Sequence, residues 1–453
     1  MKKSLLTLST LALFAGAAMA DGSFTKIWSV DNQDSYTVAA GDYIRAEGYY
    51  YNTTGEQHRG PVYNVGTMTI DGIFESYVDA SAQSMLGAQK VHGNGELRIN
   101  SALFLSPDTD FSGFTGNVDV QRGVLWFVDS KNSPVNVSEF TLSDKSMLKL
   151  TNGDFVINGA IKGSGNIHVT LYSDDEIESG VYVIKDATPA NLTIKGDISQ
   201  FNGTFDAHQK SKIRLETTLN DSVSLYSTVG GTLELVGAVG DARKTITVDS
   251  HSDSSTLGNV FMYGNKAIIA NNSREGGKVD ANCGYIYFGG NHEYTQEDVV
   301  SHSFDKTTVL GDSAGNVIMG GRGDGALTAK GIRAKVSDDV KMGTLVIGGA
   351  DGATVEGNTR LVMDSGEIDA IYGGLNGVHN GSTSIEVNGG TVGRIYGADG
   401  VGGTVNGNTQ ISVKNATVGE IYGSNYGYDA ADETKFGGIN GNVSITVDGN
   451  SKV

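Results

Sequence analysis

The chain has 453 residues and a formal net charge of −19, and its 64 glycines contrast with 4 prolines and 1 cysteine. Its glycine and proline content lies below the ~25–30% typical of disordered low-complexity chains, and glycine does not recur at every third position as in collagen. The acidic balance argues against nucleic-acid or anionic-membrane partners, which require basic patches. The lone Cys283 cannot form an internal disulfide.

The first 20 residues have the pattern of a secretory signal peptide. Lys2 and Lys3 precede an apolar run, Leu5–Ala17, and an A-M-A sequence follows at 18–20. A basic start, a short apolar stretch and an A-x-A site predict cleavage after Ala20 and export. The run is shorter than the ~20 residues of a membrane-spanning helix. No later segment approaches that length without charges, so we expect a mature chain without a transmembrane segment.

Residues 21–250 carry short, irregular strand signals. Residues 21–95 are predicted to form an N-terminal cap and the first β-helix coils, and they include a G-P-V-Y-N-V-G-T segment that starts at Gly60 and leads to Phe74. Residues 96–250 are predicted to form an irregular β-helix, with an S-x-F-x-G motif at 112–116 and again at 199–203. Two runs of alternating apolar and polar residues follow each motif, which is typical of half-buried strands.

A glycine-rich repeat dominates residues 251–453. Seven segments share an apolar pair followed by glycine, which we call the I-Y-G motif. They are 262–264, 287–289, 318–320, 346–348, 371–373, 395–397 and 421–423. The clearest units also contain a T-x-I-x-V run and a V-x-x-I-Y run separated by Gly, Asn or Asp, which indicates strands joined by turns. One unit cannot bury its apolar face alone, but stacking on the next unit does so.

We therefore predict an all-β fold, a right-handed parallel β-helix (β-solenoid) of ~25-residue coils. Ile385 should lie over Ile411, and Ile395 over Ile421, in interior columns. Glycine would supply the turn residues with positive φ. Proline is scarce because each strand of such a stack is central, and a proline would remove a ladder hydrogen bond.

The segment from Gly60 to Phe74 resembles the G-G-A-I-Y-N-x-G-T-L-x-I-x-G-x-F repeat of autotransporter passengers and polymorphic outer-membrane proteins. The S-x-F-x-G motifs are similar to the autotransporter-associated β-strand repeat, and the I-Y-G units resemble repeats of large bacterial surface proteins. The resemblance implies a bacterial protein that is secreted or displayed at the outer membrane, with glycans or proteins of a host or neighbouring cell as partners. It also implies a C-terminal translocator barrel. The sequence departs from the family here, because it contains no barrel stretch and stops within a repeat at Val453. A barrel beyond Val453 in a longer protein and a free secreted or periplasmic rod are both left open.

Two short motifs in the repeat region are candidate sites. Residues 311–315 match the G-x-S-x-G pattern with Ser313 as nucleophile, but that motif needs a following helix and a strand in phase with the repeat is expected there, so a repeat turn is favoured. Arg322 and Asp324 form an R-G-D tripeptide, which integrin-type receptors can read, although an ordinary glycine-rich turn is the favoured interpretation. No cofactor is predicted, and only diffuse calcium binding at acidic turns such as Asp351 is left open.

Paired carboxylates are the signal for a carbohydrate-active enzyme. β-Helix polysaccharide lyases and glycosidases need carboxylates that converge on one cleft. The pairs at 174–175 and 338–339 are adjacent in sequence, so in a strand their side chains would point to opposite faces. The histidines lack the spacing of metal ligands, and no metal site is predicted.

Tyr372, Tyr396 and Tyr422 recur in phase and should form an outward column beside the insertion at 425–436. The column would be either a packing ladder or a strip that binds glycans or a protein partner. We expect a non-enzymatic surface β-solenoid that serves adhesion or cell-surface structure. The alternative is a β-helix carbohydrate-active enzyme, a polysaccharide lyase or glycosidase.

Overall fold

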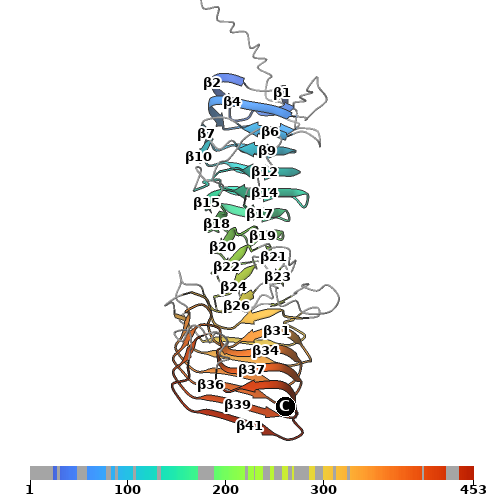
Figure 1. Cartoon of the computed structure of the whole chain (residues 1–453). Coiled ribbons are helices and arrows are strands. Elements are labelled where there is room, and N and C mark those ends of the chain that lie inside the picture. The colour runs from blue at the N-terminus through green and yellow to red at the C-terminus, as the bar shows by residue number, and fades with distance from the viewer. Residues whose placement is uncertain are drawn as a thin grey trace, which may run out of the picture.

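The computed structural model describes residues 24–27, 31–47, 59–77, 83–86, 90–105, 109–129, 134–171, 188–219, 223–228, 230–237, 245–248, 258–263, 268–269, 285–290, 299–309, 313–323, 327–399, 402–424 and 438–453. The predicted signal peptide, residues 1–20, lies outside these residues. All the secondary-structure elements among the described residues are β-strands, and these strands stack into the rod shown in Figure 1. Across the described ranges there is no helix with the length and apolar character needed to cross a membrane.

The strands form five sheets that run along the rod, and every paired strand is parallel to its neighbours. The 7-stranded sheet consists of β1 (Thr25–Ile27), β3 (Tyr43–Glu47), β5 (Ile73–Tyr77), β8 (Glu96–Ile99), β11 (Asn117–Val120), β13 (Glu139–Leu142) and β16 (Ala160–Gly163). The 13-stranded sheet consists of β10 (Asp110–Phe114), β7 (Lys90–Gly93), β4 (Arg59–Ile70), β6 (Gln83–Leu86), β9 (Ala102–Leu105), β12 (Gly123–Phe127), β14 (Ser146–Thr151), β17 (Asn166–Thr170), β19 (Thr204–His208), β21 (Ser224–Thr228), β23 (Thr245–Val248) and β25 (Ile268–Ile269), with β2 (Asp31–Val38) paired to β4.

The other three sheets extend to the C-terminal end of the rod. The 11-stranded sheet consists of β15 (Gly153–Ile157), β18 (Ala190–Ile194), β20 (Lys212–Leu215), β22 (Thr232–Leu235), β24 (Asn259–Phe261), β26 (Tyr285–Tyr287), β28 (Asn316–Ile318), β31 (Lys341–Val346), β34 (Glu367–Gly374), β37 (Thr391–Asp399) and β40 (Thr417–Tyr422). The 6-stranded sheet consists of β27 (Val300–Phe304), β30 (Ile332–Val336), β33 (Thr359–Met363), β36 (Thr383–Val387), β39 (Thr409–Lys414) and β41 (Val443–Asp448). The 4-stranded sheet consists of β29 (Leu327–Ala329), β32 (Thr354–Val355), β35 (Val378–His379) and β38 (Thr404–Val405).

Strands that pair are separated in the chain by strands of the other sheets, which is the topology of a parallel β-helix. One C-terminal coil consists of β34, β35 and β36, and each of these strands pairs with its equivalent in the next coil. The predicted β-solenoid is therefore confirmed. From β28 to β39 each coil has three described strands, whereas from β18 to β26 the described strands alternate between only two sheets. In the C-terminal coils the two-residue strands β32, β35 and β38 lie within a stretch that the sequence repeat shows only as turn residues.

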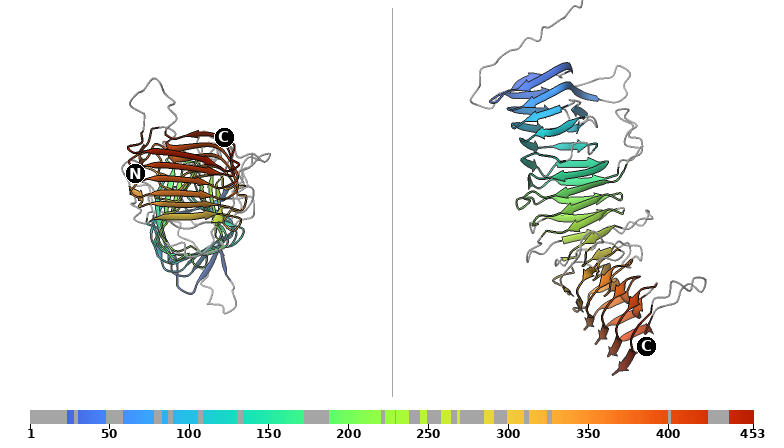
Figure 2. Two further views of the ribbon diagram at one scale, coloured as in Figure 1. Left: turned by 90° about the horizontal axis from the view of Figure 1, so that it is seen from below. Right: turned by 90° about the vertical axis from the view of Figure 1, so that its left-hand side faces the viewer.

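The 11-stranded sheet is common to both parts of the rod. The 7-stranded sheet ends at β16 and the 13-stranded sheet at β25, whereas the 6-stranded and 4-stranded sheets begin at β27 and β29. The axis of the stack changes direction near this exchange of sheets, as the right-hand view of Figure 2 shows. The 11-stranded sheet also runs across the predicted boundary at residue 250.

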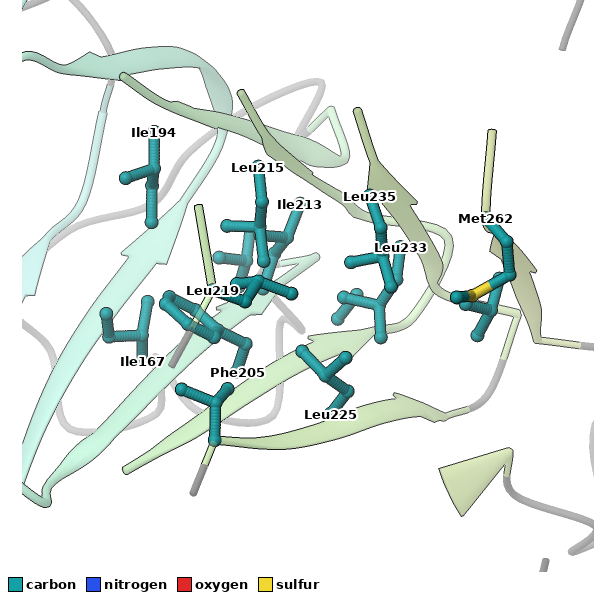
Figure 3. Packing of buried hydrophobic residues seen from close by; sticks show 14 of the residues in the cluster. Ile167, Ile194, Phe205, Ile213, Leu215, Leu219, Leu225, Leu233, Leu235 and Met262 are labelled. Carbon is teal, nitrogen blue, oxygen red and sulfur yellow. The ribbon is translucent and has the colours of Figure 1, made fainter. Parts of the chain in front are cut away.

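The core consists of apolar side chains that alternate with outward polar ones along each strand. In β30, Ile332, Ala334 and Val336 are buried while Arg333 and Lys335 are exposed. Successive coils stack these inward residues into columns, which Figure 3 shows from Ile167 to Met262. Each fully buried aliphatic side chain contributes roughly 1.5–3 kcal/mol to stability.

The predicted interior columns are present in the structure. Ile385 pairs in register with Ile411, and Ile395 with Ile421. The first three are fully buried, and Ile421 is partly buried against the same core. The alternation of the T-x-I-x-V run was thus sufficient to predict both the inward face and the stacking partner.

The described prolines also follow the expected rule. Pro61 lies within β4 at a break in register, between the pairs formed by Arg59 and Val62. Pro134 and Pro189 lie outside strands. A residue without an N–H group is tolerated at such places because no regular ladder hydrogen bond is lost there.

Asparagines stack at the corner that joins the 4-stranded and 6-stranded sheets. Asn406 Nδ2 donates a hydrogen bond of 2.8 Å to Asn380 Oδ1, and Asn440 Nδ2 donates one of 2.7 Å to Asn406 Oδ1. Each amide therefore hydrogen-bonds to the next along the rod, and the repeated Asn-Gly pair keeps this corner in register from coil to coil.

The last described coil presents its inward residues to solvent. Val443, Ile445 and Val447 of β41 are 44%, 44% and 48% exposed. Their register partners on β39 are buried. The apolar columns of the core thus continue onto β41.

Candidate functional site

Tyr372, Tyr396 and Tyr422 form a column on the outer face of the 11-stranded sheet. Tyr372 of β34 is in register with Tyr396 of β37, which is in register with Tyr422 of β40. Their ring centroids are 4.7 Å and 5.0 Å apart, and the ring planes differ by only 7° and 4°. The preceding Ile371 and Ile395 are fully buried in the core. The structure therefore places the three tyrosines in the predicted outward column.

The column continues toward the N-terminus through four apolar residues. They are Phe261, Tyr287, Ile318 and Val346, each in direct register with the next. Val346 in turn is in register with Tyr372. The rings of Phe261 and Tyr287 are stacked, with centroids 4.6 Å apart.

This register corrects the alignment of the I-Y-G motif. Val346 pairs with Tyr372 rather than with Ile371, and Phe261 rather than Met262 pairs with Tyr287. The units at 287–289, 318–320 and 346–348 are therefore one residue out of step with the units that flank them. Because side chains alternate between faces, a shift of one residue exchanges the inward and outward members of the apolar pair.

Stacking limits what the tyrosines can bind. Their centroid spacing matches the distance between neighbouring strands, about 4.7–4.9 Å, so nothing fits between adjacent rings. A sugar that stacks on an aromatic platform needs an exposed ring face. Both faces of Tyr396 and one face of Tyr422 are covered by neighbouring tyrosine rings. The column therefore offers hydroxyl groups and ring edges, and its geometry favours the packing ladder over the glycan-binding strip.

A shallow groove of about 590 Å³ lies on the same sheet, and its lining includes Asp369, Gly393, Arg394, Gly419 and Glu420. Arg394 Nε is 3.1 Å from Glu420 Oε2, and the Tyr422 hydroxyl donates a 3.2 Å hydrogen bond to the same carboxylate oxygen. The charges of Tyr396 and Glu420 raise the pKa of Arg394. The polar groups of this groove are thus already engaged with one another.

The arginine of the R-G-D tripeptide is held by the next coil. Arg322 Nε lies 2.6 Å from Asp351 Oδ2, and the backbone of Arg322 forms a parallel bridge with Ala350. Burial opposes the charged form of Arg322, but Tyr287 and Asp351 beside it raise its pKa. Burial also opposes the charged form of Tyr287, and because that form is the deprotonated one, the pKa of Tyr287 is raised. Asp324 lies outside the described residues.

This arrangement bears on two predictions. A receptor that reads the opposed charges of R-G-D would have to compete with Asp351 for the guanidinium of Arg322. Asp351 was also the turn singled out for diffuse calcium binding, and its carboxylate is occupied by the same ion pair. Receptor binding and calcium binding both remain predictions.

Ser313 is buried. Its side chain is 1% exposed, and its Oγ donates a 3.0 Å hydrogen bond to the Lys341 carbonyl and accepts one of 3.0 Å from the Gly315 N–H. The strand β28 follows, where a nucleophile elbow requires a helix. The structure gives Ser313 a structural hydrogen-bonding role, and its interpretation as part of a repeat turn stays a prediction.

Where described carboxylates approach one another, they share an arginine: Glu96 and Asp119 both contact Arg98, and Glu216 and Glu234 both contact Arg214. Asp338 and Asp339 lie in an exposed turn with φ of 58° and 56°, so the argument that adjacent strand residues face opposite sides does not apply to them. The pair at 174–175, Cys283 and the insertion 425–436 lie outside the described residues. Among the described residues, no group of three or more His, Cys, Asp or Glu side chains is placed to hold a metal ion.

Among the described residues, two carboxylates are almost fully buried, and both are ion-paired. Glu75 Oε2 is 2.7 Å from Arg45 Nε, and Glu234 Oε2 is 2.9 Å from Arg214 Nη1. Each pair connects neighbouring coils. Breaking such a pair would leave a buried charge without its counter-ion, which makes these groups part of the scaffold.

His379 is a buried titratable group that sequence reasoning missed. It occupies a column with Val355 and Val405 on the 4-stranded sheet. Its Nε2 is 2.7 Å from the Gly357 carbonyl and its Nδ1 is 3.0 Å from Thr383 Oγ1. A neutral ring with its proton on Nε2 satisfies both contacts. Burial lowers the pKa of His379. The signal in the sequence is a histidine where the two flanking coils have valine.

We expect His379→Val to reduce the loss of stability at acid pH. In the unfolded chain histidine titrates near ~6.5, whereas the folded pKa is lower, so the unfolded state takes up a proton first and stability falls as pH drops below about 6.5. The slope for one such group is at most about 1.4 kcal/mol per pH unit. The measurement is the thermal unfolding of the unmodified chain and of His379→Val at pH 7.5 and pH 5.5. If both chains lose the same stability between these two pH values, His379 is not the group that causes the loss.

No protein-family model matches this chain, and neither curated proteins nor solved structures yield a significant match.

Proposed function

We propose that this chain is an exported, non-enzymatic β-solenoid that serves adhesion or cell-surface structure, like an autotransporter passenger. The observation that carries the proposal is the unbroken register of seven coils from Phe261 to Tyr422. Most side chains of that column are buried, and the exposed groups that the register repeats are ion pairs such as Lys341–Glu367 and Arg394–Glu420. A rod of this kind repeats similar surface groups at regular steps. Contacts that are weak one by one can then add up through multivalency.

The condition of the candidate catalytic groups also supports a non-enzymatic role. Ser313 has a structural hydrogen-bonding role, and the two buried carboxylates, Glu75 and Glu234, hold ion pairs between coils. The alternative, a polysaccharide lyase or glycosidase, requires acids that converge on a cleft, ~5–9 Å apart for hydrolysis. The signal-peptide pattern supports export, and surface glycans or proteins would be the partners.

Multivalent display tests the adhesive role. Mature chain 21–453 would be coupled to beads at increasing density and presented to arrays of surface glycans and to intact cells. We expect retention to rise steeply with density, while the free chain binds weakly. The control is an equal density of chain unfolded by heat. Retention that is absent at every density would contradict adhesion.

The enzymatic alternative is tested on the same preparation. We expect no release of reducing sugars or unsaturated products from a panel of polysaccharides, and no hydrolysis of aryl esters. Turnover that disappears on substitution of a carboxylate or of Ser313 would overturn the proposal. Export is tested separately in a Gram-negative host, where the chain should begin at Asp21 after processing.

A further inference from the structure

A basic hollow lies on the outer face of the 6-stranded sheet, over β27, β30 and β33. Its volume is about 790 Å³, and Asp364 is the one carboxylate residue in its described lining. Four cationic residues line it: Lys330, Arg333, Lys335 and Arg360. This is a local excess of positive charge on a chain whose net charge is −19. The Debye length at physiological salt is ~8 Å, so nearby cations decide what this surface attracts.

Outward cations in this part of the rod are generally neutralised by a carboxylate on the following coil. The nitrogen–oxygen distances are 3.0–3.1 Å in four such pairs, Lys335–Asp364, Lys341–Glu367, Arg360–Glu386 and Arg394–Glu420. The pattern places a basic residue and an acidic residue one coil apart, so that stacking brings them together. Each pair is exposed and contributes little to stability by itself.

Arg333 departs from this pattern. On one side its register partner is Ser301, and on the other it is Arg360, a second arginine. Like charges in register on neighbouring strands are destabilising. The guanidinium of Arg360 is already engaged by both carboxylate oxygens of Glu386. Within the described ranges, no carboxylate lies at ion-pair distance from Arg333.

We propose that this hollow binds an acidic polysaccharide, with Arg333 as the anchor for a carboxylate or sulfate group. A guanidinium pairs with either group through two parallel hydrogen bonds. The exposed Ser301 and Ser303, together with Asn358, supply hydrogen-bonding groups for sugar hydroxyls along the same lining. An anion seated here would also offset the repulsion between Arg333 and Arg360.

The extent of the hollow favours a polysaccharide over a duplex nucleic acid. The cations are confined to β30, β33 and Lys330, which lies between β29 and β30. On the next two coils the residues in register with Arg360 are Ser384 and Gln410, which are uncharged. A rigid polyanion would therefore lie over neutral and acidic surface beyond the hollow, whereas a flexible acidic glycan can follow the cations alone.

The experiment measures binding of the full mature chain to immobilised heparin, which is sulfated and carboxylated, to polygalacturonate, which is only carboxylated, and to uncharged dextran. We expect binding to at least one anionic glycan, which weakens as salt is raised, and no binding to dextran. Arg333→Gln should weaken it about tenfold, as expected for loss of a charge-assisted hydrogen-bond pair. The tighter of the two anionic ligands identifies the preferred group.

Lys341→Gln is the matched control, because Lys341 is an exposed, ion-paired cation on the 11-stranded sheet, outside the hollow. We expect it to bind as the unmodified chain does. We also expect the thermal midpoint of Arg333→Gln to be unchanged or higher, because the substitution relieves the contact with Arg360. Equal binding by Arg333→Gln and Lys341→Gln, binding of dextran as tightly as the anionic glycans, or binding of duplex DNA alone would overturn the proposal.

This inference deepens the proposed adhesive role by naming a ligand class, and the two fail separately. If the chain does not bind the anionic glycans but the beads are still retained, the hollow is not a polysaccharide site and adhesion occurs through other partners. Loss of bead retention with glycan binding intact would reject adhesion and leave a polysaccharide-binding rod.

Discussion

Replacing Tyr396 with alanine is expected to destabilise the C-terminal coils by about 3–5 kcal/mol, the usual cost of truncating a buried aromatic side chain. Tyr396 is 5% exposed and its ring lies between those of Tyr372 and Tyr422. The substitution removes both stacked contacts and leaves a gap in the column that the neighbouring rings cannot close. Because each coil contacts only its neighbours, the loss should be local.

Hydrogen exchange resolved along the chain measures this effect. Protection should fall in β34, β37 and β40, whereas the strands of the 7-stranded sheet should keep theirs. Tyr422→Ala is the graded control, because Tyr422 stacks on a single described ring and is less buried, and it should lose about half as much. Tyr396→Phe keeps the stacking and should remain close to the unmodified chain. If Tyr396→Phe loses as much as Tyr396→Ala, stacking is not the cause.

Replacing Gly407 with alanine is expected to cost about 3 kcal/mol, at the upper end of the range for overpacking in a close-packed stack. Gly407 is the middle residue of an N-G-N corner, where the backbone of one coil passes close to that of the coil before it. An added Cβ would lie 2.6 Å from the Gly381 carbonyl carbon and 2.8 Å from the Ser382 nitrogen. These atoms belong to the backbone, so relief requires neighbouring coils to separate.

Gly438→Ala is the matched control for this prediction. Gly438 lies in the same C-terminal region, but a Cβ built there meets nothing within 4 Å. Its substitution should leave stability unchanged within about 0.5 kcal/mol, or raise it slightly by restricting the unfolded chain. Chemical denaturation followed by circular dichroism compares the two. Equal stability of the two variants would show that close backbone approach does not determine the glycine content.

The fold could be predicted from the sequence because equivalent positions of successive repeats stack on one another. The T-x-I-x-V run alternates with period two, so the pattern predicts that Ile385 points inward. Ile411 occupies the same position of the repeat one coil later, and it is the residue on which Ile385 stacks. By contrast, the apolar pair of the I-Y-G motif has two adjacent apolar residues, so its pattern does not say which one faces the core. Hydrogen-bonding register decided this, and it placed Val346 rather than Ile347 in the outward column with Tyr372.

The candidate sites were less accessible, for a physical reason. Ser313 could be judged from sequence because its motif requires a particular local context. The chemistry of Arg322, His379 and Arg333 depends on residues 22 to 29 positions away that stacking brings into contact. Asp351, Gly357 and Arg360 are those partners.

The sequence alone thus determined that the chain is a glycine-rich, proline-poor stack of parallel strands, because local alternation and a regular period suffice for that. The tertiary structure decided which sheets continue through the rod, which apolar residues face outward and which charged side chains form an ion pair with the next coil. These depend on the exact register between coils, and a shift of one residue reverses every face. Arg333 is the clearest case, since only the stacked register sets it beside a second arginine.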